Sequence, residues 1–388
     1  MGGIYVKSKK MMSVLLTAAL AVSVLAGCGS SKTETETVSY MEKIPDNDPA
    51  LQQQEVVEEV VEEEPDAAVI PDGMYRSELT GLPISEEIKD QRPIAAMVDN
   101  EKTALQHYGT AEADIVYEIM NSTANDRVTR LMVIVKDWAQ IEQLGSIRST
   151  RPTNIPLAGE YNAVLCHDGG PYYIDDWLAR AWAAHFSGGF SRVKNGKDWE
   201  FTEYVTASDL DEKFASSSYT TEYNQYAPDR DSHFLFVDYG TTLDLSEEYS
   251  NCQNATNVDL SAAFKHNSSQ LKYNESTGTY DYYEYGEIHK DAEDGEVLTF
   301  ENVILQNTTF SQLDENGYLI YNMINADDQF RPGYYLTGGK AIPITWLKES
   351  ETAITKYYTE DGEELQINSG KTYIGLIPSD YWSGISLQ

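Results

Sequence analysis

Basic side chains are scarce in this chain of 388 residues, which has 28 Lys and Arg against 63 Asp and Glu and a net charge of −35. So acidic a surface is repelled by nucleic-acid phosphates, which argues against nucleic acid as a partner. Only three Cys are present, too few for a fold that depends on disulfide bonds. The length leaves room for two or three domains, each with its own hydrophobic core.

Familiar catalytic and metal-binding motifs are also missing. The chain has no His-Glu-x-x-His, no paired Cys-x-x-Cys and no EF-hand spacing. The Gly-x-Ser-x-Gly elbow and Gly-rich phosphate loops are absent too. The sequence therefore predicts no metal and no cofactor, and it leaves open whether the protein is an enzyme.

One long apolar run is present, from Met11 to Val24, and it is shorter than the roughly 18 to 20 residues that span a bilayer. Three Lys precede it, and Leu25-Ala26-Gly27-Cys28 follows it. This pattern is typical of an exported bacterial lipoprotein, with a signal peptide at residues 1–27 and lipid on Cys28. Two or more acyl chains anchor a protein stably in a membrane. We therefore expect the protein at the outer face of the cytoplasmic membrane, with a transmembrane helix as the less favoured alternative.

An acidic segment follows the lipidated Cys and extends over residues 28–72. Its residues 29–72 contain 13 Asp and Glu but only two Lys. Such a segment cannot bury enough apolar surface to fold and repels itself, so it predicts an extended tether. Four Val between positions 56 and 61 recur at helical spacing, which makes a weak helix the alternative.

The first part of the folded region, residues 73–248, contains short apolar runs and one helical pattern. We expect strands at residues 93–98, 114–118, 129–135 and 163–166. Continuous apolar runs of this kind are typical of strands with both faces covered. Residues 175–186 begin with two Asp and end before Gly188-Gly189, which predicts a helix. These elements predict an N-terminal layered α/β domain.

The second part, residues 249–388, is rich in alternating Tyr and in turn dipeptides such as Asn316-Gly317. A hairpin is expected from residues 271–273 and 279–285. Further strands are expected at residues 303–306, 318–321, 341–346, 354–358 and 372–377. We predict a C-terminal, mostly antiparallel β domain. Its Tyr side chains are expected to pack within the sheet, with stacking on sugar rings or contact with an envelope protein as the alternatives.

An Arg cluster opposes the acidic background, because four of the ten Arg lie between positions 127 and 151. They are Arg127, Arg130, Arg148 and Arg151. Guanidinium groups bind carboxylates and phosphates through paired hydrogen bonds, and Ser149 adds a hydroxyl group. Two interpretations stay open: a pocket for an anion, or an internal network in which each Arg pairs with a carboxylate.

The segment His167-Asp168-Gly169-Gly170 follows the apolar run that ends at Cys166. A His at a strand end can act as an acid or base, but an ordinary turn is the interpretation that we favour, since no nucleophile is apparent. Cys166 has apolar neighbours and is expected to be a buried thiol. A disulfide between Cys166 and Cys252 stays open.

Short motifs along the folded region are similar to those of the YerB-like bacterial lipoproteins. In the first half they are Thr80-Gly81-Leu82-Pro83, Arg92-Pro93, Val98-Asp99-Asn100, residues 113–118, Thr129-Arg130, residues 145–149, Arg151-Pro152, His167 and Gly169-Gly170. In the second half they are His289 with Asp291, residues 302–306, residues 344–348, Asp361-Gly362 and residues 370–372. The resemblance covers nearly all of residues 76–378. It implies an exported, lipid-anchored protein with an α/β-type domain, a β domain and no established activity.

We therefore predict a membrane-anchored lipoprotein that binds an anionic cell-envelope ligand or an envelope partner. The residues expected to form the site are Arg130, Arg148, Ser149, Arg151 and His167, with Asp99, Asn100 and Glu118 orienting the Arg groups. The alternative is an enzyme that acts on a cell-wall polymer or a lipid-linked phosphate. In it, Arg130 and Arg148 hold phosphate while His167 or Asp99 is the acid or base.

Overall fold

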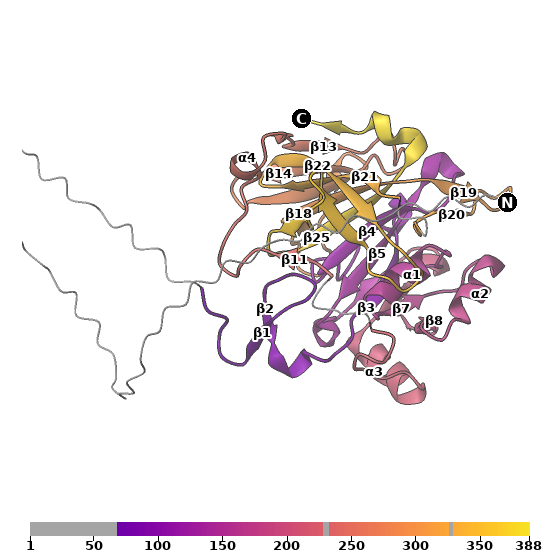
Figure 1. Cartoon of the computed structure of the whole chain (residues 1–388). Helices are drawn as coiled ribbons and strands as arrows, with labels where there is room; N and C mark the ends of the chain where they lie inside the picture. Colours follow the sequence, from indigo (N-terminus) through magenta and orange to yellow (C-terminus); the bar gives the residue numbers. More distant parts are fainter. Residues whose placement is uncertain (1–67, 228–232, 326–328) are drawn as a thin grey trace, which may run out of the picture. The chain divides into compact units, whose positions relative to one another are not determined.

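An 11-stranded sheet runs through the computed structural model, which describes residues 68–227, 233–325 and 329–388 (Figure 1). The strand order is β12-β22-β21-β18-β25-β4-β5-β3-β7-β8, and β23 pairs with β22. The bounds are β12 Gln253–Asn254, β22 Lys340–Leu347, β21 Arg331–Thr337, β18 Asn302–Thr308, β25 Thr372–Pro378, β4 Ile115–Met120, β5 Thr129–Val135, β3 Ile94–Asp99, β7 Val164–His167, β8 His185–Ser187 and β23 Lys356–Thr359. The predicted signal peptide, Cys28 and nearly all of the predicted tether lie outside the described residues.

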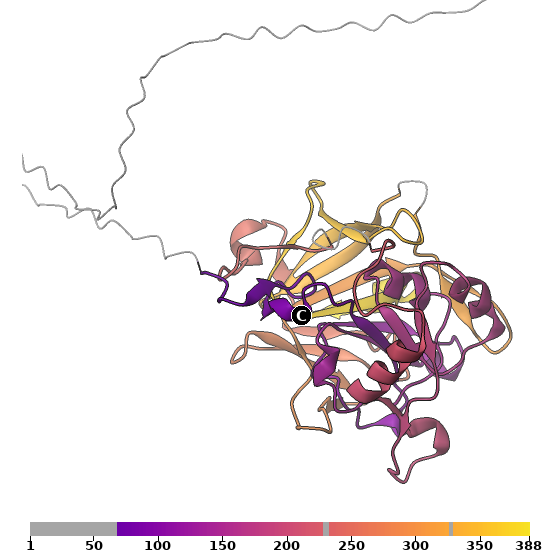
Figure 2. The same ribbon diagram turned by 90° about the horizontal axis from the view of Figure 1, so that it is seen from below.

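Strands from both halves of the folded region share this sheet. β25 pairs in parallel with β18 on one side and with β4 on the other. Figure 2 shows the yellow and orange strands of the second half beside the purple strands of the first half. The sheet is mixed, because β4, β5 and β3 are antiparallel while β3, β7 and β8 are parallel. The predicted combination of an α/β part and a mostly antiparallel part is confirmed.

Both faces of the central strands are buried, as their continuous apolar sequences predict. Along β3, Ile94, Ala96 and Val98 face one hydrophobic core, whereas Ala95 and Met97 face the other. This division follows from the strand geometry, since successive side chains point to opposite faces. The first core also includes side chains of a second sheet and of α3 (Ala207–Ser216), and the second core includes side chains of α1 (Asn154–Glu160).

The second sheet has the order β16-β15-β14-β13-β26, with β17 paired to β15. Its strands are β16 Glu287–Ile288, β15 Thr279–Glu284, β14 Gln270–Asn274, β13 Asn257–Asp259, β26 Ser386–Leu387 and β17 Thr299–Phe300. The predicted hairpin is present as β14 and β15. Tyr280 and Tyr282 are almost fully buried, so these two Tyr serve packing within the fold.

Four two- or three-stranded sheets and two further helices complete the described elements. The strand pairs are β1 Met74–Arg76 with β2 Pro83–Ser85, β11 Leu235–Phe236 with β24 Gln366–Ile367, and β19 Phe310–Gln312 with β20 Leu319–Tyr321. The remaining sheet joins β6 Leu144–Gly145, β10 Glu203–Val205 and β9 Ser191–Arg192. The helices are α2 Asp175–Leu178 and α4 Leu245–Glu248.

The helix predicted over residues 175–186 is much shorter in the structure. α2 ends at Leu178, and residues 185–187 form β8. β8 pairs in parallel with β7, and Phe186 is buried in the core. The prediction was wrong because backbone pairing with β7 and burial of Phe186 outweigh the helix propensity of the Ala-rich segment.

The two thiols in the described residues are not joined. Cys166 lies buried in β7, and Cys252 is partly exposed and also free. Burial raises the pKa of the Cys166 thiol to about 12, so it is neutral and unreactive at physiological pH. The disulfide that the sequence left open is absent, and Cys166 is the core thiol that its neighbours predicted.

Candidate anion-binding site

The candidate site lies where the loop of residues 145–151 runs beside the end of β3. Arg148 N donates a hydrogen bond to Met97 O over 2.9 Å, which holds this loop against the strand. The antiparallel register of β3 and β5 places Asp99 directly opposite Arg130. Residues that are distant in the sequence are thereby brought together at the end of β3.

Asp99 is the shared partner of two Arg side chains. Its Oδ2 lies 2.6 Å from Arg148 Nε and 3.7 Å from Arg130 Nη2, and the carboxylate is buried. Arg148 also reaches Glu200, with 2.8 Å between its Nη2 and Glu200 Oε2, and 26% of its side chain is exposed. Two carboxylates thus neutralise Arg130 and Arg148.

Arg151 differs from its neighbours, because no carboxylate among the described residues pairs with it. Only 8% of the residue is exposed. Its Nη1 donates to Thr150 O over 2.9 Å, and its guanidinium lies 4.5 Å from the centre of the Tyr318 ring. Its Nε is buried without a hydrogen-bond partner in the described structure. Burial, and then the positive charge of Arg130, lower the pKa of Arg151 to about 9.

A small cavity of about 10 Å³ lies between Arg130 and Arg151, which is room for about one water molecule. The enclosed side of the cluster therefore holds no larger ligand. Three residues of this region are partly exposed, and we call them the rim: Arg148, Ser149 and Tyr318.

Arg127 has a separate role in the structure. Its two terminal nitrogens lie 3.0 and 2.6 Å from the two carboxylate oxygens of Asp380, and its guanidinium is 4.1 Å from the Tyr381 ring centre. This paired geometry attaches the C-terminal segment to the turn before β5. Arg127 is thus a structural member of the predicted Arg cluster.

Asn100 and Glu118 lie in a different buried network, and within the described residues neither forms a hydrogen bond or ion pair with the Arg groups. Glu118 accepts hydrogen bonds from the hydroxyl groups of Thr129, Ser269 and Tyr373. Asn100 Nδ2 donates to Thr129 Oγ1 over 2.9 Å. Burial raises the pKa of Glu118 to about 7. These two residues connect the halves of the fold and do not orient the Arg side chains.

His167 ends β7, and both of its ring nitrogens have partners. Nδ1 lies 2.8 Å from Gly169 O, and Nε2 lies 3.1 Å from His185 Nδ1. Burial lowers the pKa of His167 to about 4, so the ring is neutral at physiological pH. Asp168 lies 3.7 Å from Arg192 and not in the Arg130 to Arg151 group. The structure therefore agrees with the turn interpretation of this segment.

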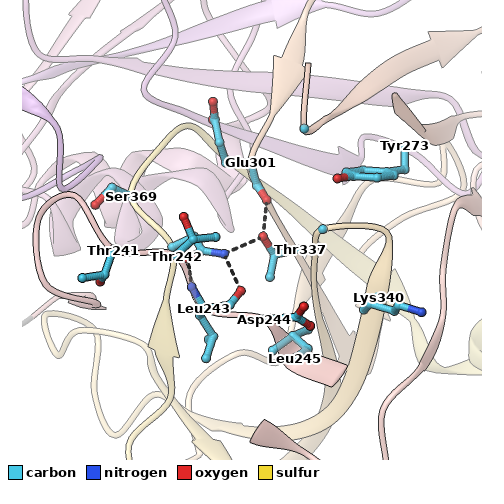
Figure 3. A pocket seen from close by; sticks show the side chains of 13 residues that line it. Thr241, Thr242, Leu243, Asp244, Leu245, Tyr273, Glu301, Thr337, Lys340 and Ser369 are labelled. Atoms are coloured by element: carbon cyan, nitrogen blue, oxygen red, sulfur yellow. Dashed lines mark hydrogen bonds between the residues drawn. The ribbon is translucent and has the colours of Figure 1, made fainter. Parts of the chain in front are cut away.

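A larger pocket of about 440 Å³ lies elsewhere, and sequence reasoning missed it (Figure 3). Most of its lining residues are of polar types, and they come from distant segments: Thr241, Thr242, Leu243, Asp244, Leu245, Tyr273, Gly278, Glu301, Thr337, Gly338, Lys340, Asn368 and Ser369. Asn368 Nδ2 donates to Thr337 Oγ1 over 3.0 Å, which fixes part of this lining. In the sequence, the local features of this pocket are the turn Gly338-Gly339 and the loop with Thr241-Thr242. Both are typical of ordinary turns, so they do not predict a binding site.

Comparison with known proteins gives consistent results for both halves of the chain. Residues 79–220 match the family model described as Protein of unknown function (DUF3048) N-terminal domain, and residues 259–374 match its C-terminal domain. The chain is 22% identical over 306 residues to "Putative lipoprotein YerB" of Bacillus subtilis (strain 168), covering 78% of this chain and 86% of that protein. The crystal structure of the YerB protein from Bacillus subtilis matches with a TM-score of 0.67 at 21% identity, over 81% of this chain and 99% of that one. This likeness shows the fold.

Proposed function

We propose that this chain, which belongs to the DUF3048 family of proteins of unknown function, is a lipid-anchored envelope protein that binds a small anionic ligand. The ligand is a phosphate or carboxylate group held by Arg151 and Arg148. The protein serves as a binding component at the outer face of the cytoplasmic membrane.

The anchoring part of the proposal rests on Cys28 and the segment before it. A relative whose name includes the word lipoprotein supports it. Among the described residues, no helix has both the length and the apolar character needed to cross a bilayer. Lipid on Cys28 supplies the attachment in this proposal.

The binding part rests on one observation, that Arg151 is buried and pairs with no carboxylate in the part of the chain that the structure describes. Arg130 and Arg148 pair with Asp99 and Glu200, so among the described residues the charge of Arg151 is in excess. A buried charge without a counter-charge is unfavourable, and a bound anion would relieve that cost. The partly exposed Arg148 and Ser149 offer further donors at the rim.

Binding is favoured over catalysis because the two candidate acid or base groups are already engaged. Asp99 accepts hydrogen bonds from Arg148 Nε and from the Glu101 backbone N. His167 has partners on both ring nitrogens. Neither residue is free to exchange a proton with a ligand at the rim.

Melting temperatures of the full chain in detergent provide a first test. Inorganic phosphate and a carboxylated sugar acid are expected to raise the melting temperature, whereas an uncharged sugar is not. Arg148→Gln should weaken this rise, and Arg180→Gln, which changes a half-exposed Arg paired with Glu351, should not. A rise that is the same in all three proteins would contradict the proposed location of the site.

A second candidate function is the binding of a neutral polyhydroxylated ligand in the 440 Å³ pocket. In Figure 3, Tyr273 and Lys340 border the cavity opposite Thr241 and Ser369. Two carboxylates and one Lys line the pocket, which disfavours an anion, whereas hydroxyl groups and an aromatic ring suit a sugar. Tyr273→Ala should abolish binding of a neutral N-acetylglucosamine oligomer, and the exposed-site control Tyr226→Ala should retain it.

A further inference from the structure

Three buried metal-ligating side chains meet between the segment before β4 and the second sheet. They are His107, Glu284 at the end of β15, and His289 directly after β16. Their exposed fractions are 0%, 2% and 4%. One nitrogen or carboxylate oxygen of each lies within 4.8 Å of those of the other two. This arrangement is compact enough for one ion to replace the contacts between them.

Two polar atoms of this group have no hydrogen-bond partner in the described part of the chain. They are His107 Nδ1 and Glu284 Oε2. A native fold rarely leaves buried polar atoms unpaired, because each one loses its hydrogen bonds to water. Two such atoms in one group of three ligating side chains indicate a missing partner that both can bind.

The ring of His107 is held in the orientation that a metal ligand requires. Its Nε2 lies 2.6 Å from Asp99 O, so Nε2 carries the hydrogen and donates it to this carbonyl. The lone pair is then on Nδ1, the unpaired atom. A metal-bound His commonly donates its other N–H to a backbone carbonyl in this way.

His289 is held by an equivalent outer contact. Its Nε2 lies 3.1 Å from Thr110 Oγ1, and Asp291 Oδ2 accepts hydrogen bonds from Thr110 N and Thr110 Oγ1. Its Nδ1 lies 2.8 Å from Glu284 Oε1. An ion between these atoms would displace the proton that they share.

We propose that His107, Glu284 and His289 bind one divalent transition-metal ion, with Zn²⁺ as the favoured species, and that this ion is structural. Two imidazoles and one carboxylate are a ligand set for zinc and not for Mg²⁺ or Ca²⁺, which prefer oxygen ligands. The complete burial of the three side chains argues for a structural role. The ion would attach the segment before β4 to the hairpin of β15 and β16.

The first test is the metal content of the full chain purified without chelators. We expect about one Zn²⁺ per chain, retained on dialysis, and a chelator-induced fall in the melting temperature that added Zn²⁺ reverses. Substitution of the ion by Co²⁺ should give the visible absorption of a four-coordinate site, bound by the three side chains and one water molecule. A chain that takes up no metal when incubated with Zn²⁺, and whose melting temperature is unaffected by chelator, would overturn the proposal.

Substitutions of the proposed ligands test where the ion is bound. Glu284→Gln and His107→Gln should lose most of the bound metal, whereas His185→Gln, which changes a His outside the group, should keep it. Should a ligand variant not fold, the reversible effect of the chelator on the unaltered chain still decides the question. Metal that remains bound to both ligand variants would show that it is held elsewhere, which contradicts the assignment.

Discussion

Lys348 Nζ lies 2.7 Å from Glu160 Oε2, and both side chains are completely buried. Glu160 ends α1 in the first half of the fold, and Lys348 directly follows β22 in the second half. Thr355 donates two further hydrogen bonds to the same oxygen. This ion pair connects the two family segments inside the protein, away from solvent screening.

Lys348→Met is expected to destabilise the protein by about 3–5 kcal/mol, because it leaves the Glu160 carboxylate buried without its cation. Chemical denaturation measures this change. Lys265→Met, at a pair in which both side chains are 68% exposed, should cost less than about 1 kcal/mol. Equal effects of the two substitutions would show that the buried pair has no special role.

Asp114→Asn is expected to change how stability depends on pH. Burial raises the pKa of Asp114 from 3.8 to about 7. Between these values the folded chain holds a proton that the unfolded chain has released, so this residue makes stability fall as the pH rises from about 4 to 7. Asn cannot titrate, so the variant does not lose this stability. Its free energy of unfolding, compared with that of the wild type, should rise by about 1–3 kcal/mol between pH 4 and pH 8.

The matched control for this pH profile is Glu275→Gln, at an exposed position in the turn of the β14 and β15 hairpin. Its profile of unfolding free energy should run parallel to that of the wild type. If the profile of Asp114→Asn also ran parallel to that of the wild type, titration of buried Asp114 would not be the cause of the pH dependence.

Arg151→Gln distinguishes a binding residue from a scaffolding one. Because Arg151 is buried and the described residues give it no counter-charge, its replacement should change the free energy of unfolding by less than about 0.5 kcal/mol, or raise it. Denaturation in ligand-free buffer measures this. A loss of about 2 kcal/mol or more would mean that Arg151 holds the fold together.

Cys28→Ser is expected to release the protein from the membrane, because Ser cannot carry the thioether-linked lipid. Cell fractionation should find the wild type with membranes and the variant in the soluble extracellular or periplasmic fraction. Cys252→Ser, at a free and partly exposed thiol, is the control and should stay with the membranes. A variant that remains with the membranes would contradict anchoring through Cys28.

Much of the fold was predictable because local patterns determine it. The apolar run at 129–135 has the same bounds as β5, and the hairpin around residue 276 follows from alternation and turn residues. The helix predicted over 175–186 failed, since pairing of β8 with β7 is a long-range contact that composition does not reveal. The pairing of β25 with β4 could not be predicted either, because these strands are far apart in the chain.

The site was predictable only in part. Asp99 lies with Arg130 and Arg148 as expected, because strand ends and a short loop place them together. Asn100 points into another network although it is adjacent to Asp99, since neighbouring residues of an extended chain face opposite ways. The group of His107, Glu284 and His289 has no sequence signature, because its members come from segments far apart in the chain.

The most direct test of the account is an isothermal titration of the full chain with inorganic phosphate, comparing the wild type, Arg151→Gln and Arg180→Gln. The wild type and Arg180→Gln are expected to bind phosphate with equal affinity, and Arg151→Gln with affinity about 10- to 100-fold weaker, the range for one charge-assisted hydrogen bond. The same affinity in all three proteins, or no binding in any of them, would contradict an anion site at Arg151.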